Sequence, residues 1–351
     1  MVALYFENAC YEWHMHKRKE NERLSFSFLG TTIQPVKKRI LMAKNNSETK
    51  PNTAIKAKGT EVKTEIKSPF SPFKPHKAKS KSTMEYGSYY ELSIKLPFAK
   101  KERMLRVWLP PEYETYKDAR FPVIYFSDGQ NLVDKELSAY GDWHLDRVVH
   151  SLTEEGLVPP ILVGLDCPKV PMDRSNELNP PYEVKKSVRK HGPNAPIGDQ
   201  YVDFMADEIK PLIDKTFRTN PSKEYTGLGG SSMGGIMSFY GFFYRKDVFG
   251  FALSFSIPVF FYEKSDWILL LQSLGDDPSS VGKLSIFVGG KDFEKMFTKG
   301  NIWLTKHLRS LGFGEDKLLF MLDTKLPHHE ESWYTYSADA LRFWLKDLSI
   351  K

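Results

Sequence analysis

Two adjacent serines lie among glycines in the segment GLGGSSMGG, which runs from residue 227 to residue 235. Residues 230–234 read GSSMG and fit the pattern G-x-S-x-G with Ser232 at the centre. This pattern is typical of a sharp strand-to-helix turn that exposes the central hydroxyl at a helix N-terminus, where N–H groups stabilise developing negative charge. The spacing predicts that Ser232 is a nucleophile and that Ser231 points into the protein.

A serine nucleophile needs a base that removes its proton, and after such a turn the acid and the histidine follow the serine in the chain. Three histidines follow Ser232. His307 falls within a predicted helix, whereas His328 and His329 lie in the segment KLPHHEESW, just after the last predicted strand. That position favours one of these two adjacent histidines as the general base.

A carboxylate that orients the histidine completes such a site. We expect it after the preceding strand, where the segment FVGGKDFEK contains Asp292 and Glu294. Asp292 lies nearer to the strand end and is the preferred candidate, with Glu294 as the alternative. The residue pattern therefore predicts a Ser-His-Asp triad.

The negative charge on the reacting carbonyl oxygen needs two N–H donors. One is expected from Met233, directly after the nucleophile. The other is expected from the loop after the strand FPVIYF, which reads SDGQN at residues 127–131. We assign it to the N–H of Gln130, beside Gly129, which allows the backbone to approach closely. Asp128 in this loop is a candidate pocket residue, the alternative being a simple turn.

The elements that must position these residues alternate along the chain. Residues 89–96 and 103–110 alternate polar and apolar side chains and predict an antiparallel hairpin. Short apolar runs then predict parallel strands covered on both faces at residues 121–127, 160–167, 223–230, 251–256, 284–290 and 318–323. Helical patterns occupy residues 199–217, 233–244, 300–313 and 332–348. This order predicts an α/β fold with a mostly parallel central sheet and helices on both faces.

Basic residues concentrate before residue 85. Residues 1–84 contain 17 Lys and Arg against seven Glu, although the whole chain has a net charge of only +6, so the remainder is acidic. The basic segment is rich in Lys, Ser, Thr and Pro and cannot bury enough apolar surface to fold alone. We predict a mostly disordered extension over residues 1–84 and one folded domain over residues 85–351. No nucleic-acid signature accompanies the charge, so a specific nucleic-acid partner is not expected.

Two cysteines, Cys10 and Cys167, are too few for a disulfide framework or a thiolate metal cluster. The N-terminal segment has no long apolar region of the kind found in signal peptides. The longest apolar stretch, residues 248–262, is too short to span a bilayer and contains Pro258. These features favour a soluble, cytoplasmic protein.

Several segments together resemble the putative esterase family of α/β-hydrolases, which includes enterochelin-type siderophore esterases, feruloyl esterases, S-formylglutathione hydrolase and mycolyltransferases. They are FPVIYFSDGQNLVD, GDWHLD, GLGGSSMGGIMSFYGFFYRKDVFGFALSFS and HHEESW, and the likeness covers residues 86–350. One branch ends in H-x-E-x-x-W, which His328, Glu330 and Trp333 match, so the resemblance selects His328. It implies the α/β-hydrolase fold and a serine hydrolase without a metal or organic cofactor. Pro327 departs from the small residue common before the base.

A long polar insertion over the strand ends, residues 167–200, is expected to shape the substrate pocket. Its basic residues, which include Arg174, favour an anionic or catechol-type acyl group, with a solvated charged face as the alternative. Trp143 and Trp333 are candidates for an aromatic wall of the pocket, with core packing as the alternative.

These residues together predict hydrolysis of small-molecule carboxylic esters through an acyl-enzyme on Ser232. An acyltransferase would use the same residues and differ only in whether an alcohol replaces water. A non-catalytic interaction protein would not need a serine, an acid and a histidine in this order.

Overall fold

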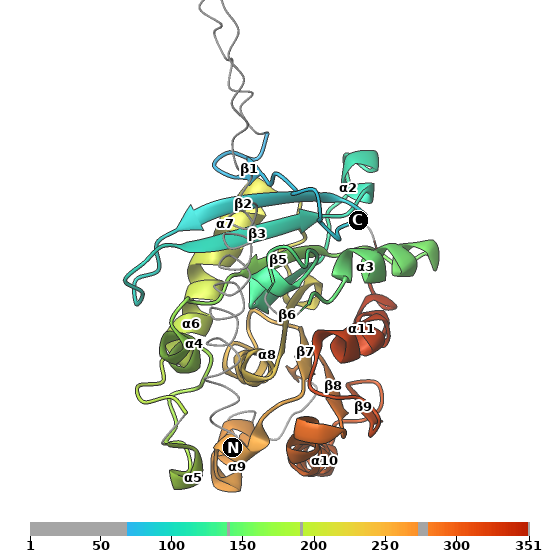
Figure 1. Ribbon diagram of the computed structural model, residues 1–351. Coiled ribbons are helices and arrows are strands. Elements are labelled where there is room, and N and C mark those ends of the chain that lie inside the picture. Colours follow the sequence, from blue (N-terminus) through green and yellow to red (C-terminus); the bar gives the residue numbers. More distant parts are fainter. Residues whose placement is uncertain (1–68, 139–140, 190–191, 273–279, 350–351) are drawn as a thin grey trace, which may run out of the picture. The chain divides into compact units, whose positions relative to one another are not determined.

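A computed structural model describes residues 69–138, 141–189, 192–272 and 280–349. In this part of the chain, nine strands form one sheet in the order β1-β2-β3-β5-β4-β6-β7-β8-β9 (Figure 1). The strands are β1 (Lys74–Pro75), β2 (Ser88–Ile94), β3 (Arg103–Leu109), β4 (Val123–Ser127), β5 (Ile161–Leu165), β6 (Thr226–Ser231), β7 (Phe251–Phe255), β8 (Lys283–Gly289) and β9 (Leu318–Asp323).

The sheet changes from antiparallel to parallel along this order. β2 pairs antiparallel with β1 and β3, and β3 pairs antiparallel with β5. All pairs from β5 through β9 are parallel. The predicted hairpin and mostly parallel sheet are therefore confirmed. Because parallel strands end at the same edge of a sheet, the loops that follow β4, β6, β8 and β9 meet there. These loops contain the predicted site residues.

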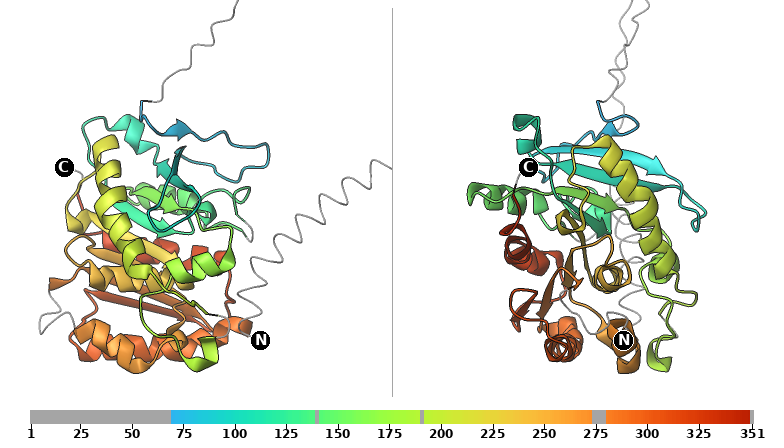
Figure 2. Two further views of the ribbon diagram at one scale, coloured as in Figure 1. Left: turned by 90° about the vertical axis from the view of Figure 1, so that its left-hand side faces the viewer. Right: turned by 180° about the vertical axis from the view of Figure 1, so that it is seen from behind.

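Helices cover both faces of the sheet (Figures 1 and 2). Apolar residues of α3 and α11 belong to the core on one face, and those of α6 to α10 belong to the core on the other. The helices are α2 (Glu112–Thr115), α3 (Leu145–Glu154), α4 (Pro171–Glu177), α5 (Lys186–Arg189), α6 (Gly198–Phe204), α7 (Lys210–Thr216), α8 (Met233–Tyr244), α9 (Lys264–Gln272), α10 (Lys295–Ser310) and α11 (Glu330–Leu345). Every residue of β4, β5 and β7 is buried, which explains their unbroken apolar sequences.

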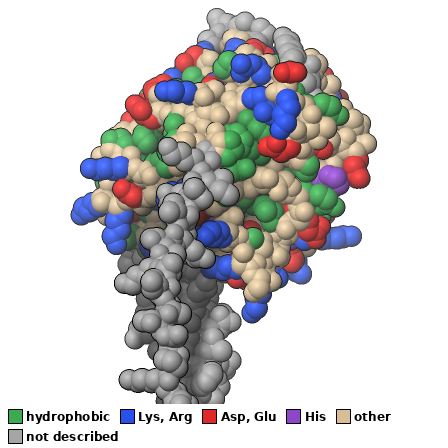
Figure 3. Space-filling view, turned by 90° about the horizontal axis from the view of Figure 1, so that it is seen from above, with side chains coloured by type: hydrophobic (Ala, Val, Ile, Leu, Met, Phe, Trp, Pro, Cys, Tyr) green, Lys and Arg blue, Asp and Glu red, His purple; other side chains and the backbone are tan. Residues whose placement is uncertain are grey.

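The described surface carries charges of both signs. On the face seen from above, Lys and Arg side chains are interspersed with Asp and Glu (Figure 3). Among the described residues, no helix is long and apolar enough to cross a membrane. In the same part of the chain, His, Cys, Asp and Glu do not form a group of three that could hold a metal ion.

The folded unit begins earlier than the sequence indicates. Phe73 is 0% exposed, and its ring lies 5.3 Å from that of Phe217 between centroids. The short strand β1 pairs with β2 directly after it. The predicted boundary between residues 84 and 85 is therefore wrong, because residues 69–84 pack against the domain. The earlier part of the predicted extension, residues 1–68, lies outside the described residues.

Polar contacts hold the end of this N-terminal segment. The Ser82 hydroxyl donates to Asp134 Oδ2 at 2.8 Å, and the Thr83 hydroxyl donates to Asp142 Oδ2 at 2.8 Å. Both carboxylates are buried. A buried carboxylate that loses its donors is costly, so this segment contributes to the stability of the loop between β4 and α3.

We expect Phe73→Ala to lower the free energy of unfolding by about 3 kcal/mol, because it leaves a cavity beside Phe217. Urea unfolding followed by tryptophan fluorescence measures the change. The control is Lys74→Ala at the next, exposed position, for which a change of at most about 0.5 kcal/mol is expected. Equal stabilities of the two variants would show that residues 69–84 do not belong to the cooperative unit.

Candidate active site

Ser232 lies in the tight turn between β6 and α8. Its backbone has φ 57° and ψ −124°, in a region that non-glycine residues rarely adopt. The Ser232 N–H donates to the carbonyl oxygen of Phe255, at the end of β7, at 2.9 Å. The surrounding structure therefore holds a strained backbone at the point where the G-x-S-x-G pattern places the nucleophile.

Two glycines permit this turn. A Cβ at Gly230 would lie 2.4 Å from the carbonyl oxygen of Gly234, and a Cβ at Gly235 would lie 2.4 Å from that of Phe255. At Gly234 the nearest contact would be 3.3 Å, to Ser127. The steric need for glycine is thus strongest at Gly230 and Gly235, so the second glycine of the pattern is less restricted than its neighbour.

The burial of Ser231 and Ser232 differs from the prediction. Ser232 is 6% exposed, whereas Ser231 is half-buried. The prediction that Ser232 is exposed and Ser231 points inward is therefore not matched by their burial. The turn that holds Ser232 is hydrogen-bonded to the end of β7 through the Ser232 N–H.

His328 is bound to a buried carboxylate, and that carboxylate is Glu294. His328 Nδ1 contacts Glu294 Oε2, and Glu294 is 0% exposed. Glu294 Oε1 accepts hydrogen bonds from the Ser256 hydroxyl at 2.6 Å and from the Gly289 N–H at 3.0 Å. Both carboxylate oxygens are therefore held, and the ring of His328 is oriented by one of them.

Asp292 does not occupy the place predicted for it. It is exposed, has φ 53°, and begins the 3₁₀ turn η6 (Asp292–Glu294). This turn directs Glu294, two residues later, under the end of β8. The prediction of Asp292 as the carboxylate beside the histidine is thus wrong, and the alternative, Glu294, contacts His328.

Aromatic rings enclose the imidazole of His328. It stacks on Phe297 with 4.6 Å between ring centroids and meets Trp333 edge to face at 5.1 Å. Trp333 Nε1 donates to the Ser256 hydroxyl at 2.9 Å, which also bonds Glu294. Sequence reasoning missed Ser256, and its position directly after the apolar run of β7 is the signal that identifies it as an edge residue.

His329 has a different role from its neighbour. Its side chain caps α11, because His329 Nδ1 accepts a hydrogen bond from the Glu331 N–H at 3.2 Å. The cap turns the ring toward the helix backbone. Of the two adjacent histidines, His328 is the one that the structure pairs with a carboxylate.

The predicted aromatic wall is packed inside the domain. Trp143 is stacked on Phe255 at 5.6 Å and lies at the same centroid distance from Trp333. Both tryptophans are buried. The two rings pack against each other and, through Trp143, against Phe255 at the end of β7. Core packing therefore describes them better than a pocket lining does.

The loop after β4 approaches the neighbouring strand at its glycine. A Cβ at Gly129 would lie 2.4 Å from the backbone of Gly164 in β5. The Gln130 side chain is fixed to the end of the same strand, because the Cys167 N–H donates to Gln130 Oε1 at 3.0 Å. As the first residue of α8, Met233 has an N–H without a partner inside its helix.

An ion pair lies beside this loop. Arg174, from α4, donates to both carboxylate oxygens of Asp128 at 2.8 Å and 2.6 Å. A Cβ at Gly234 would lie 3.6 Å from Asp128 Oδ2, which places this carboxylate over the first turn of α8. Asp128 and Arg174 are thus brought together at the start of the helix that follows Ser232, where their opposite charges are paired.

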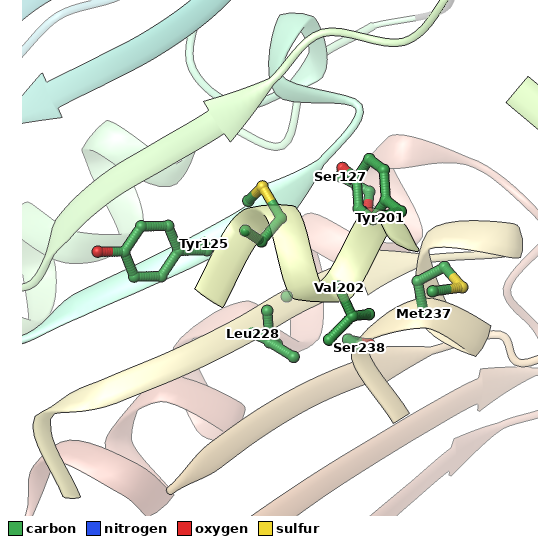
Figure 4. Close-up of a pocket in the computed structure, with 9 residues that line it drawn as sticks. Tyr125, Ser127, Tyr201, Val202, Leu228, Met237 and Ser238 are labelled. Atoms are coloured by element: carbon green, nitrogen blue, oxygen red, sulfur yellow. Dashed lines mark hydrogen bonds between the residues drawn. The ribbon is translucent and has the colours of Figure 1, made fainter. Parts of the chain in front are cut away.

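A small pocket lies in the core behind this site (Figure 4). Tyr125 and Ser127 of β4 contribute to its lining together with Tyr201, and the Tyr201 hydroxyl donates to the Ser127 hydroxyl at 3.4 Å. Figure 4 shows the Tyr125 hydroxyl directed away from this pair. Most of the other lining side chains are apolar, and the residues that line this pocket include neither Ser232 nor His328.

A mostly parallel sheet covered by helices, with a serine in a strained strand-to-helix turn, defines an α/β-hydrolase fold. Residues 98–310 match the family described as "Esterase: Putative esterase". This match covers more than half of the chain, so the protein belongs to that family and is an esterase. The resemblance of the sequence to this family is confirmed.

Individual similar proteins are distant in sequence. The uncharacterized protein YbbA of Bacillus subtilis is 21% identical over 259 residues, which cover 69% of this chain and 92% of YbbA. An IroE-like serine hydrolase from Shewanella oneidensis has a TM-score of 0.58 at 19% identity, covering 76% of this chain and 82% of its own. The siderophore hydrolase EstA from Aspergillus nidulans has a TM-score of 0.56 at 17% identity, covering 79% and 99%. At such identities, the two solved structures show the same fold.

Proposed function

We propose that this esterase hydrolyses small-molecule carboxylic esters through an acyl-enzyme on Ser232, with His328 as the base and Glu294 as the residue that orients it. The observation that carries the proposal is the contact of His328 with the buried carboxylate of Glu294, at the sheet edge where Ser232 is held in its strained turn. A carboxylate on Nδ1 fixes the tautomer in which the other ring nitrogen can accept a proton.

Two consecutive residues at the end of β7 connect the proposed nucleophile to the proposed acid. The carbonyl oxygen of Phe255 accepts from the Ser232 N–H, and the hydroxyl of the next residue, Ser256, donates to Glu294. The positive φ of Ser232 is the kind of strained backbone expected at a nucleophile elbow, which supports its assignment as the reacting residue.

The reaction would proceed in two proton-balanced halves. His328 removes the hydroxyl proton of Ser232 as the serine oxygen attacks the ester carbonyl, and the N–H groups of Met233 and Gln130 stabilise the oxyanion. The carbon–oxygen bond to the alcohol breaks, and the alcohol takes the proton from His328. Water then attacks the acyl group and gives its proton to His328. The acid leaves, and the proton returns to Ser232.

Trapping the acyl-enzyme tests this proposal. We expect a pre-steady-state burst of 4-nitrophenol from 4-nitrophenyl acetate, because acylation of an activated ester outruns deacylation. Acid quenching followed by peptide fragmentation should place the acetyl group on Ser232. A label on any other residue, or turnover without a covalent intermediate, would contradict the proposal. Adding an alcohol acceptor to the same assay measures how much acyl group is transferred to it instead of to water.

A further inference from the structure

Glu330 is a buried carboxyl group between the two loops of the proposed site. It is the first residue of α11, lies two residues after His328, and is 5% exposed. Asn131 Nδ2 donates to Glu330 Oε1 at 3.4 Å. Asn131 belongs to the turn η1 (Gly129–Asn131), which also contains Gln130. Glu330 therefore joins the loop of the proposed base to the loop of the proposed oxyanion donor.

Charged residues of two other loops influence Glu330. From the loop after β4 there is Asp128, paired with Arg174 of α4. From the loop before α3 there is Asp142, which bonds the Thr83 hydroxyl and lies 3.0 Å from His144 Nδ1.

The loop that carries Glu330 itself adds His328 and His329. A Cβ at Gly141 would lie 3.7 Å from the Cβ of Glu330 and 3.8 Å from Cε1 of His329, so the loop before α3 packs against both. The two acidic groups from neighbouring loops make this corner of the site unfavourable for a further negative charge.

Burial is the main cause that raises the pKa of the Glu330 carboxyl to about 7, and Asp128 and Asp142 raise it further. The Glu330 backbone N–H and Arg174 act in the opposite direction and lower this pKa. Below neutral pH the carboxyl is a neutral acid that can donate a hydrogen bond. Above neutral pH it is an anion that only accepts.

Two basic residues of the 167–200 insertion are matched by carboxylates. Arg174 is bound to Asp128, and Lys185 Nζ lies 3.3 Å from Glu263 Oε2. The sequence-based expectation of an anionic acyl group depends on these basic residues. The carboxylate of Asp128, by contrast, lies over the first turn of α8 and is bound to Arg174. The carboxyl of Glu330 accepts from Asn131, in the turn that also contains Gln130. Two acidic groups at this edge favour a hydrogen-bond donor or a cation of the substrate over an anion.

We propose that Glu330 is a specificity-determining residue of the ester site, which accepts a hydrogen bond from, or donates one to, a hydroxyl group of the substrate or attracts a cationic group by its charge, and which selects against substrates with a carboxylate there. This inference rests on the proposed function and adds a substrate class to it. It replaces the expected anionic acyl group by a neutral or cationic one.

Two matched ester series test the selectivity on either side of the scissile bond. One series contains 4-nitrophenyl esters of 4-(trimethylammonio)benzoic, 4-methylbenzoic and terephthalic acid. The other contains thiobutyrates of 2-(trimethylammonio)ethanethiol, 3,3-dimethylbutanethiol and 3-mercaptopropionic acid. The measured quantity is the ratio of kcat/KM for the cationic ester to that for the anionic ester, from pH 6 to pH 8. This ratio cancels every effect of pH that the cationic and anionic esters share.

In the wild-type protein we expect the ratio to rise about tenfold over this range in at least one series, as the Glu330 carboxyl loses its proton. In Glu330→Gln the ratio should stay low and constant. The matched control is Glu331→Gln, at the adjacent exposed position, which should behave as the wild type. A ratio unchanged by Glu330→Gln, or an equal loss on all three esters of a series, would overturn the proposal.

A second variant keeps the test independent of how Glu330→Gln folds. Asn131→Ala removes a donor to the Glu330 carboxylate, so the pKa of Glu330 should rise and the midpoint of the ratio should move to higher pH. An unmoved midpoint would also count against the proposal. Hydrolysis of the neutral ester that persists in Ser232→Ala would instead refute the proposed function, so the two failures are distinguishable.

Discussion

Ser232→Ala is expected to lower kcat/KM for 4-nitrophenyl acetate by about 10⁵-fold or more, because no other hydroxyl takes the place of the attacking nucleophile. Ser231→Ala is the matched control one residue earlier. It should change kcat/KM by no more than about threefold, since Ser231 is the last residue of β6 and precedes the strained turn. Initial rates of nitrophenol release measure both variants.

The two alanine variants remove the same group from adjacent positions, so a comparison of their thermal unfolding separates a loss of fold from a loss of chemistry. Ser232→Ala should unfold at about the same temperature as the wild type, because alanine keeps the Cβ and leaves the backbone of the turn unchanged. Equal loss of activity in both variants would mean that the turn, rather than the Ser232 hydroxyl, is what activity requires.

Glu294→Gln is expected to reduce kcat by about 10⁴-fold, while Asp292→Asn should leave it within about twofold. The amide keeps the size of the side chain, but its NH₂ group can face His328 Nδ1 and favour the wrong tautomer of the ring. Asp292 is exposed on the surface of the turn, whereas Glu294 is the carboxylate that contacts the histidine. Single-turnover rates with 4-nitrophenyl acetate measure the effect on acylation.

Glu294 is also part of a buried network with Ser256 and Trp333, so its replacement has a structural cost as well. Urea unfolding of Glu294→Gln gives that cost separately. Suppose that Glu294→Gln keeps its acylation rate and Asp292→Asn loses most of it. Asp292 would then be the acid, and the assignment of Glu294 from its contact with His328 would be wrong.

Local patterns were sufficient for most of the architecture. The apolar runs of β4, β5 and β7 predict buried parallel strands because residues covered on both faces are mostly apolar, and every residue of these three strands is buried. The helix over 233–244 is observed as α8. The glycines around Ser232 predict a tight turn because only a residue without a side chain fits at Gly230 and Gly235. These constraints act between residues close in sequence or repeat along one element.

The sequence by itself thus determined the fold class, the family resemblance and the segment that contains each candidate site residue. Only the tertiary structure decided between Asp292 and Glu294, because both follow the same strand and the choice depends on which carboxyl reaches His328, 34 residues away from Glu294. The tertiary structure also packs the ring of Phe73 against that of Phe217 in the core, and it brings the Asn131 amide within hydrogen-bond distance of Glu330. Those contacts join segments far apart in the chain, and their burial and charge arise only when the sheet brings them together.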